Sequence, residues 1–212
     1  MIRVGLAVLA IVFAAATAAQ SAPIAGLFNT GVDNAGNALA AGSLDPHYSI
    51  LSPSQSAVVV RDNIPGTWVP NSPTSRWVWE TVNGTPTSVT RTFRTTFDLT
   101  GLNPATAFIF GNWSTDNSGL DILINGISTG NTCGGFSFLC GFSITAGFVA
   151  GLNTLDFVVR DLGVISGFLV TSIRGEADLI QNGNQIPEPA SLALLGIGLT
   201  GIGAIARRRK RA

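Results

Sequence analysis

The chain has few side chains that could support catalysis. His47 is the only histidine, and it lies close to Asp45 and Tyr48, so it could form one member of a catalytic group. No GxSxG motif and no evident serine or cysteine nucleophile accompanies it. A lone histidine is more often a hydrogen-bonded structural residue, and we favour that interpretation here.

Carboxylates are the second possible source of chemistry. Glycoside hydrolysis needs two carboxylates at a set separation. Between residues 23 and 183 the acids are Glu80, Glu176 and nine aspartates, many of them next to Gly or Asn. Aspartate is favoured in turns at such positions, because its side chain bonds the local backbone. We therefore expect a protein without enzymatic activity.

Two oxygen-rich loops could bind calcium, which takes six to eight oxygen ligands. The first is residues 33–37, and the second supplies Asp116, Asn117 and Asp121 as candidate ligands of a structural calcium ion. The alternative is that these side chains bond their own backbone in turns. No other cofactor is expected.

Four tryptophans could form a platform on which sugar rings stack, or they could fill a core. Trp77 and Trp79 alternate along one predicted strand, which favours the core, and Trp113 also lies in a predicted strand. Trp68 lies in the proline-rich loop of residues 64–73. It is therefore the best candidate for an exposed ligand contact.

Both ends of the chain have the composition of targeting segments. Arg3, the apolar residues 4–16 and the small residues 16–19 predict a signal peptide over residues 1–22, cleaved between about 18 and 22. An uncleaved anchor is the alternative. At the other end, residues 190–206 carry no charge and would span about 25 Å as a helix, the short end of what crosses a bilayer.

Export places the body of the protein in an oxidising compartment. Cys133 and Cys140 are the only cysteines, and we expect them to form a disulfide. On the chain-entropy model such an eight-residue loop contributes roughly 2.5 kcal/mol. Two free thiols are the alternative, and the spacing does not fit a zinc site.

The apolar segment 190–206 lies between two polar motifs. The triplet Pro187-Glu188-Pro189 precedes it, and a basic block follows it, consisting of Arg207, Arg208, Arg209, Lys210 and Arg211. The positive-inside rule keeps that block in the cytoplasm as a stop-transfer signal, with the body on the outer face. A plain membrane anchor behind a proline linker is one interpretation of this arrangement.

The three parts in this order resemble the PEP-CTERM sorting signal, here residues 184–212. The resemblance implies that exosortase, a membrane protease-transpeptidase, recognises the triplet and cleaves the tail near it. It implies transient anchoring in the inner membrane, with the body in the periplasm, and then delivery to the cell surface or the extracellular matrix. The family also tends to accompany exopolysaccharide production.

Residues 23–183 have the composition of strands and turns. Eight alternating or β-branched runs are separated by polar turns, and Asn125-Gly126 predicts a tight hairpin. The runs are residues 56–61, 75–82, 88–99, 105–113, 120–127, 142–148, 152–160 and 167–179. We predict an all-β domain, an antiparallel β-sandwich of the jelly-roll type, between an N-terminal signal helix and a C-terminal transmembrane helix.

The rhythm of strands and turns over residues 92–177 is similar to that of galactose-binding-like jelly rolls. It combines a Phe-rich strand, an Asp-Asn loop, the Asn-Gly hairpin and a Gly-Leu-Asn turn. The resemblance implies a fold and allows a lectin-like module, but it assigns no sugar-binding residue.

Charge excludes one class of partner. Between the two targeting segments, six arginines and no lysine stand against eleven acids, a net charge of about −5. Nucleic acid and anionic lipid are therefore not expected as partners, because binding to phosphate needs a basic surface. A structural component associated with exopolysaccharide is the first hypothesis, a carbohydrate-binding module the second, and a glycan-active enzyme the last.

Overall fold

The computed structural model describes residues 20–180, in which there are eleven β-strands and no helix. All paired strands run antiparallel. The strands are β1 (Ser21–Pro23), β2 (Leu44–Ile50), β3 (Gln55–Val59), β4 (Val78–Trp79), β5 (Thr90–Asp98), β6 (Phe108–Asp116), β7 (Ser118–Ile124), β8 (Ile127–Ser128), β9 (Cys140–Ile144), β10 (Leu152–Arg160) and β11 (Gly167–Asp178). The prediction of an all-β, antiparallel domain is confirmed.

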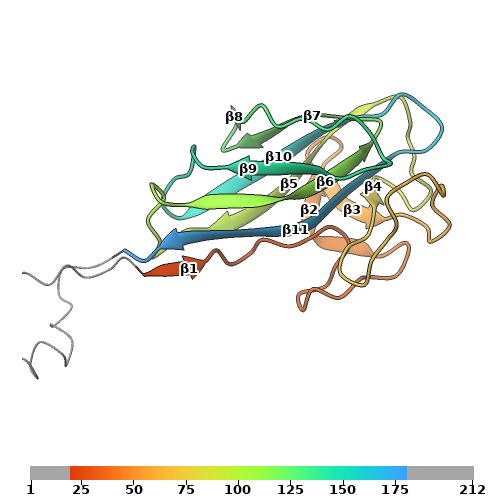
Figure 1. Cartoon of the computed structure of the whole chain (residues 1–212). Helices are drawn as coiled ribbons and strands as arrows, with labels where there is room; N and C mark the ends of the chain where they lie inside the picture. The colour runs from red at the N-terminus through yellow and green to blue at the C-terminus, as the bar shows by residue number, and fades with distance from the viewer. Residues whose placement is uncertain (1–19, 181–212) are drawn as a thin grey trace, which may run out of the picture. The chain divides into compact units, whose positions relative to one another are not determined.

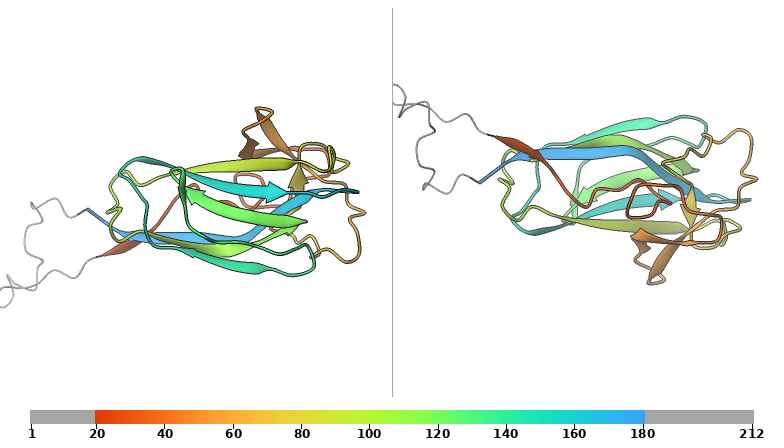
Figure 2. Two further views of the ribbon diagram at one scale, coloured as in Figure 1. Left: turned by 90° about the horizontal axis from the view of Figure 1, so that it is seen from above. Right: turned by 90° about the horizontal axis from the view of Figure 1, so that it is seen from below.

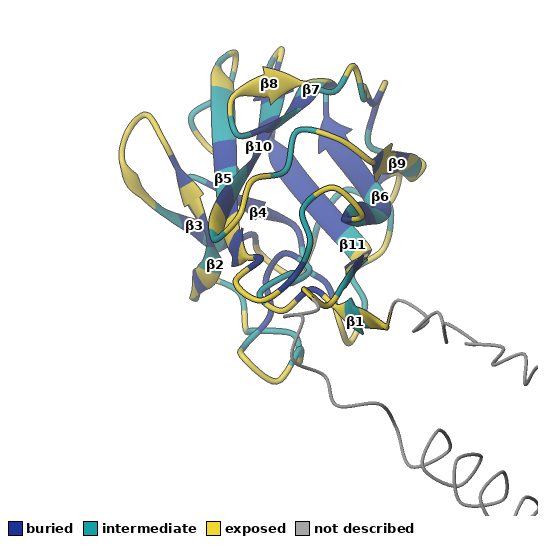
Figure 3. Ribbon diagram, turned by 90° about the vertical axis from the view of Figure 1, so that its left-hand side faces the viewer, coloured by how far each residue is buried: buried dark blue, intermediate teal, exposed yellow. Residues whose placement is uncertain are grey.

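The strands form one hydrogen-bonded path in the order β8-β7-β10-β5-β2-β3-β4-β11-β6-β9, and β1 is added beside β11. Figures 1 and 3 show that this path bends back on itself, so that β5, β10 and β7 face β11, β6 and β9. The long strands each bury one face, as period-two alternation requires. The result is a sandwich of two layers with a single core between them.

The core is centred on two phenylalanines from opposite layers. Phe157 of β10 and Phe168 of β11 lie with ring centroids 5.1 Å apart. Phe157 also contacts Tyr48, Trp113 and Phe142, at centroid distances of 6.3, 5.6 and 5.8 Å. Aromatic pairs in such tilted and edge arrangements contribute about 0.5–1.5 kcal/mol beyond the area they bury. These contacts therefore hold the two layers together.

Strand boundaries follow the sequence patterns closely where the pattern is strong. The run of residues 152–160 is β10 in full, and the alternating run of residues 88–99 contains β5. Asn125 and Gly126 both have positive φ, 51° and 80°, and they join β7 to β8 with Ile124 opposite Ile127. The Asn-Gly hairpin is confirmed.

Two predictions of strands were less accurate. The run of residues 75–82 contains only the two-residue strand β4, because the backbone on either side of it bonds loops instead of a neighbouring strand. Strand β2, with the sequence LDPHYSI, was missed. It contains Pro46 and has no apolar alternation, and its place is fixed by pairing with β3 and β5.

The first and last described strands meet at one end of the sandwich. Ser21 pairs with Asp178, and the backbone N–H of Leu179 donates to the carbonyl of Gln20 at 2.8 Å. Figure 2 shows this end opposite the loop of residues 60–77. We call the end with β1 and the end of β11 the base, and the opposite end the tip.

The predicted ends of the chain lie largely outside the described residues. This holds for the signal helix, the transmembrane helix of residues 190–206, and the motifs at 187–189 and 207–211. Strand β1 begins at Ser21, two residues before the predicted start of the domain at 23. Within residues 20–180, no helix has the length and hydropathy of a membrane span.

Candidate functional site

Trp68 is not the exposed ligand contact that its loop predicted. Only 4% of the residue is exposed, and its ring lies 4.3 Å from that of Trp77, centroid to centroid. Gly167 leaves the space for both indoles, because a Cβ there would approach within 2.5 Å of the Trp68 ring. The Trp68 Nε1–H donates to Asp116 Oδ2 at 3.0 Å. That prediction was wrong because the proline-rich loop folds inward over β11.

The other three tryptophans are also buried. Trp77 and Trp79 are fully enclosed, as the alternating pattern predicted, and so is Trp113. Their rings are part of the core and present no face to solvent. A stacking platform for sugars made of tryptophan is therefore absent from the described part of the chain.

Asp116 and Asp161 form a pair of buried acids at the tip. They are 5% and 1% exposed. Burial, and then the charge of Asp161, raise the pKa of Asp116 to about 6, while the hydrogen bond from Trp68 opposes the rise. Asp161 Oδ2 accepts from the backbone N–H of Ser88 at 2.6 Å and of Gly163 at 3.0 Å.

In each of these two acids only one carboxylate oxygen, Oδ2, accepts a hydrogen bond. Asp116 Oδ1 and Asp161 Oδ1 are buried and have no hydrogen-bond partner among the described residues. A buried carboxyl with a raised pKa beside a second acid is an arrangement that acid–base sites often use. Here, however, both residues are buried. The pair organises the loops at the tip.

The three candidate calcium ligands all accept hydrogen bonds from the protein. Asp116 bonds Trp68, Asn117 Oδ1 accepts from the Leu162 N–H at 2.7 Å, and Asp121 Oδ1 accepts from Ile122 and Gly130 at 2.8 and 3.1 Å. Over residues 20–180 no three His, Cys, Asp or Glu side chains cluster as metal ligands do. Hydrogen-bond donors occupy Asp116 Oδ2, Asn117 Oδ1 and Asp121 Oδ1, whereas Asp116 Oδ1 has no partner among the described residues.

The first oxygen-rich loop adopts the turn that was its alternative explanation. Asp33 Oδ1 accepts from the backbone N–H groups of Ala35 and Asn37, both at 2.9 Å. Such bonds from a side chain to the backbone two residues on define an Asx turn. The loop of residues 33–37 is therefore explained by local structure.

His47 is not paired with a carboxylate. Its ring stacks on Phe28, with centroids 3.6 Å apart and planes at 4°, and its buried Nε2 has no partner in the described range. Asp45 instead accepts from the backbone N–H groups of Gly31, His47 and Tyr48. The ring of His47 is thus held by stacking, where we expected a hydrogen bond.

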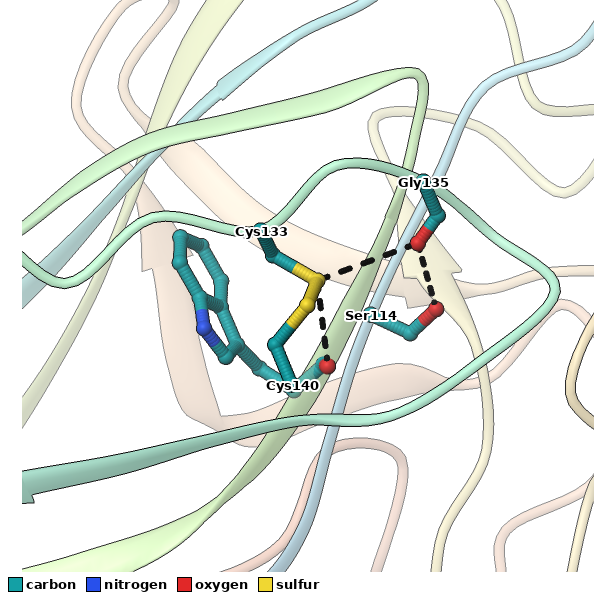
Figure 4. Close-up of a disulfide and its surroundings, with 5 residues drawn as sticks. Ser114, Cys133, Gly135 and Cys140 are labelled. Atoms are coloured by element: carbon teal, nitrogen blue, oxygen red, sulfur yellow. Dashed lines mark hydrogen bonds between the residues drawn. A yellow bond between two sulfur atoms is a disulfide. The ribbon is translucent and has the colours of Figure 1, made fainter.

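The predicted disulfide between Cys133 and Cys140 is present, with Cα atoms 5.6 Å apart. Figure 4 shows how the loop that it closes lies against β6: the hydroxyl of Ser114 donates to the carbonyl of Gly135, at 2.9 Å. Cys140 also pairs with Trp113 across β9 and β6. The bond therefore fastens the loop of residues 133–140 to an edge of the sandwich.

Three ion pairs among the described residues were not predicted, and one of them joins Arg76 to Asp62. Arg91 Nε donates to Glu80 Oε2 at 2.6 Å, and Arg94 binds both oxygens of Asp156 at 2.7 Å. The only sequence signal was the position of Arg91 among apolar residues of a strand, which predicts a buried partner but does not name it. Nothing in the sequence links Asp161 to Ser88, 73 residues earlier.

A groove of about 280 Å³ lies beside β8 and the end of β9. Its lining is apolar or hydroxyl-bearing and includes no charged and no aromatic side chain. The lining residues are Ile124, Ile127, Ser128, Thr129, Ser143, Ile144, Thr145, Ala146 and Gly147. Such a surface can hold a small neutral molecule but supplies no acid or base.

The chain's clearest functional signal lies after the sandwich. Residues 185–210 carry a PEP-CTERM protein-sorting motif. The match includes Pro187-Glu188-Pro189, the apolar segment and the basic block through Lys210. A PEP-CTERM motif indicates an exported protein that exosortase sorts and processes.

The remaining comparisons add no relative for the sandwich. No curated protein and no solved structure shows significant similarity to the chain. The PEP-CTERM resemblance is therefore supported, while the likeness of residues 92–177 to galactose-binding-like jelly rolls stays a prediction.

Proposed function

We propose that the chain is a non-catalytic component of the cell surface or extracellular matrix, delivered there by exosortase. The observation that carries the proposal is the sorting motif at residues 185–210. In this proposal residues 190–206 hold the protein in the inner membrane for a short time, residues 207–211 stop its translocation, and the Pro187-Glu188-Pro189 triplet is the recognition site.

The sandwich supports a structural role, associated with exopolysaccharide, in three ways. Four of its acids, Asp45, Asp116, Asp156 and Asp161, are buried, Asp33 accepts hydrogen bonds within a turn, and His47 is stacked. Its disulfide suits an oxidising compartment. Its acidic, lysine-free composition limits binding to anionic polymers and is compatible with a neutral glycan matrix.

The mass of the mature protein tests the sorting proposal. In a strain that contains exosortase, we expect a chain that ends near Pro187, without the arginine tail. Glu188→Gln should block this processing and leave the sandwich folded, while Glu176→Gln in the sandwich should be processed normally. Recovery of the intact tail from the unaltered chain would show a permanent anchor instead.

Carbohydrate binding by a galactose-binding-like jelly roll is the second candidate function. The observation that favours it is the uncharged groove beside β8 and β9, which offers hydroxyls next to apolar side chains. A glycan array that includes the host's own exopolysaccharide tests it, with residues 20–183 as the probe. Absence of binding to every glycan would exclude the lectin interpretation and leave the structural one.

A further inference from the structure

The base of the sandwich exposes apolar side chains from two adjoining segments. Leu152 is 67% exposed, Val149 48% and Leu179 40%. The loop of residues 99–103 joins the two segments, because the Leu99 N–H donates to the carbonyl of Gly151 and Leu102 pairs with Leu179. The backbone segments that carry the three side chains therefore adjoin at this end of the sandwich, and we call its exposed apolar side chains the apolar base.

The chain itself limits how far the apolar base can be from a membrane. Nine residues, 181–189, separate Ile180 from the first residue of the apolar segment 190–206. Even fully extended, they span at most about 30 Å. While that segment is inserted in a bilayer, Ile180, which follows the end of β11 at Asp178, stays within about this distance of the headgroups.

Charge determines which kind of lipid surface the base can meet. Residues 98–105, 147–152 and 176–180 contain no lysine or arginine, and they contribute the acids Asp98, Glu176 and Asp178. Anionic headgroups would repel these carboxylates, and electrostatic attraction is the usual partner of apolar insertion at a membrane surface. The base therefore fits a zwitterionic bilayer that it contacts through apolar side chains alone.

We infer that the apolar base, centred on Val149, Leu152 and Leu179, rests on the zwitterionic surface of the bilayer while the sorting tail is inserted. The inference rests on the membrane-anchored stage of the proposed function. A tether of nine residues raises the effective concentration of the base at the surface, so that a contact too weak to bind the free domain becomes populated. Cleavage of the tail removes the tether and releases the base.

The test uses the full chain in phosphatidylcholine nanodiscs and a tryptophan placed on the base. Leu152→Trp should lose most of its added emission when the nanodisc lipids are brominated, because bromine quenches only indoles that reach the bilayer. Leu162→Trp is the matched control, since Leu162 is 63% exposed but lies at the tip. Strand β11 alone spans about 40 Å between the two ends.

Each outcome has one meaning. Stronger quenching by brominated lipid at position 152 than at position 162 supports the inference. Equal quenching of the two variants in nanodiscs that contain the chain overturns it and leaves membrane anchoring intact. Failure of the unaltered chain to enter nanodiscs at all would overturn the anchored stage and this inference with it. If Leu152→Trp does not fold, Val149→Trp provides the same measurement from the neighbouring residue.

Discussion

At the scale of single residues, the least expected group is Asp116. Its carboxyl is buried beside Trp68 and close to the charge of Asp161, and its pKa is raised to about 6. A folded-state pKa above the unfolded value means that the folded protein holds its proton more tightly. The unfolding free energy should therefore fall as pH rises from about 4 to about 6, and level off above that range.

Asp116→Asn should remove this dependence. The amide oxygen can still accept from the Trp68 Nε1–H, while the buried charge is gone. A rise in pKa from 3.8 to about 6 corresponds to roughly 3 kcal/mol, so we expect the variant to be more stable than the unaltered sandwich at pH 7 by up to that amount. Urea denaturation between pH 4 and 8 measures it.

Asp33→Asn is the control for the variant at position 116. Backbone hydrogen bonds from the Asx turn lower the pKa of the exposed Asp33 carboxyl, so its ionised form is favoured by folding. Its replacement should give no gain at pH 7. A loss of stability in Asp116→Asn at pH 7 would contradict the assignment of a destabilising buried charge.

At the scale of elements, the disulfide stabilises the loop of residues 133–140. Replacing Cys133 and Cys140 together by serine should lower the unfolding free energy by roughly 2.5 kcal/mol, the value expected for a loop of this length. The strands should remain, because β6 and β9 still pair along five residues. Circular dichroism and urea denaturation check both statements, and reduction of the unaltered protein should reproduce the loss.

Strand β1 should matter for where the signal peptide is cut. Its pairing with β11 places Ser21 and Ala22 in the fold, so a cut after Ala19 retains the strand and a cut after Ala22 removes most of it. A chain that starts at Ile24 should unfold several degrees below one that starts at Gln20, since about 1–2 kcal/mol shifts the midpoint by roughly 2–8 °C for a domain of this size.

Thermal unfolding of the two chains measures this difference. Equal midpoints would show that β1 adds nothing to the sandwich. If the midpoints differ as expected, N-terminal sequencing of the exported protein should find Gln20 or Ser21 as its first residue, because a cut there keeps the paired strand β1.

At the scale of the whole molecule, the described residues up to Leu179 belong to one compact unit. The sandwich has its own core, centred on Phe157 and Phe168. We therefore expect residues 20–183 to fold alone and to unfold in one cooperative transition by calorimetry. A broad transition, or folding only in the presence of detergent, would contradict the view that the tail serves only as a sorting signal.

Local sequence patterns determined a large part of this protein. Strand alternation, the Asn-Gly hairpin, the cysteine pair and the sorting motif depend on residues close together in the chain, where geometry and composition act directly. Leu152–Arg160 and Asn125-Gly126 were predictable for that reason.

Tertiary structure decided what depends on contacts between distant residues. Trp68 was expected to be exposed because of its proline-rich loop, but Trp77, Gly167 and Asp116 bury it. Asp116 was a candidate calcium ligand by sequence, and packing against Trp68 and Asp161 turned it into a buried acid with a raised pKa. Burial and electrostatics depend on which segments meet in space, and a pattern of neighbours along the chain does not contain that information.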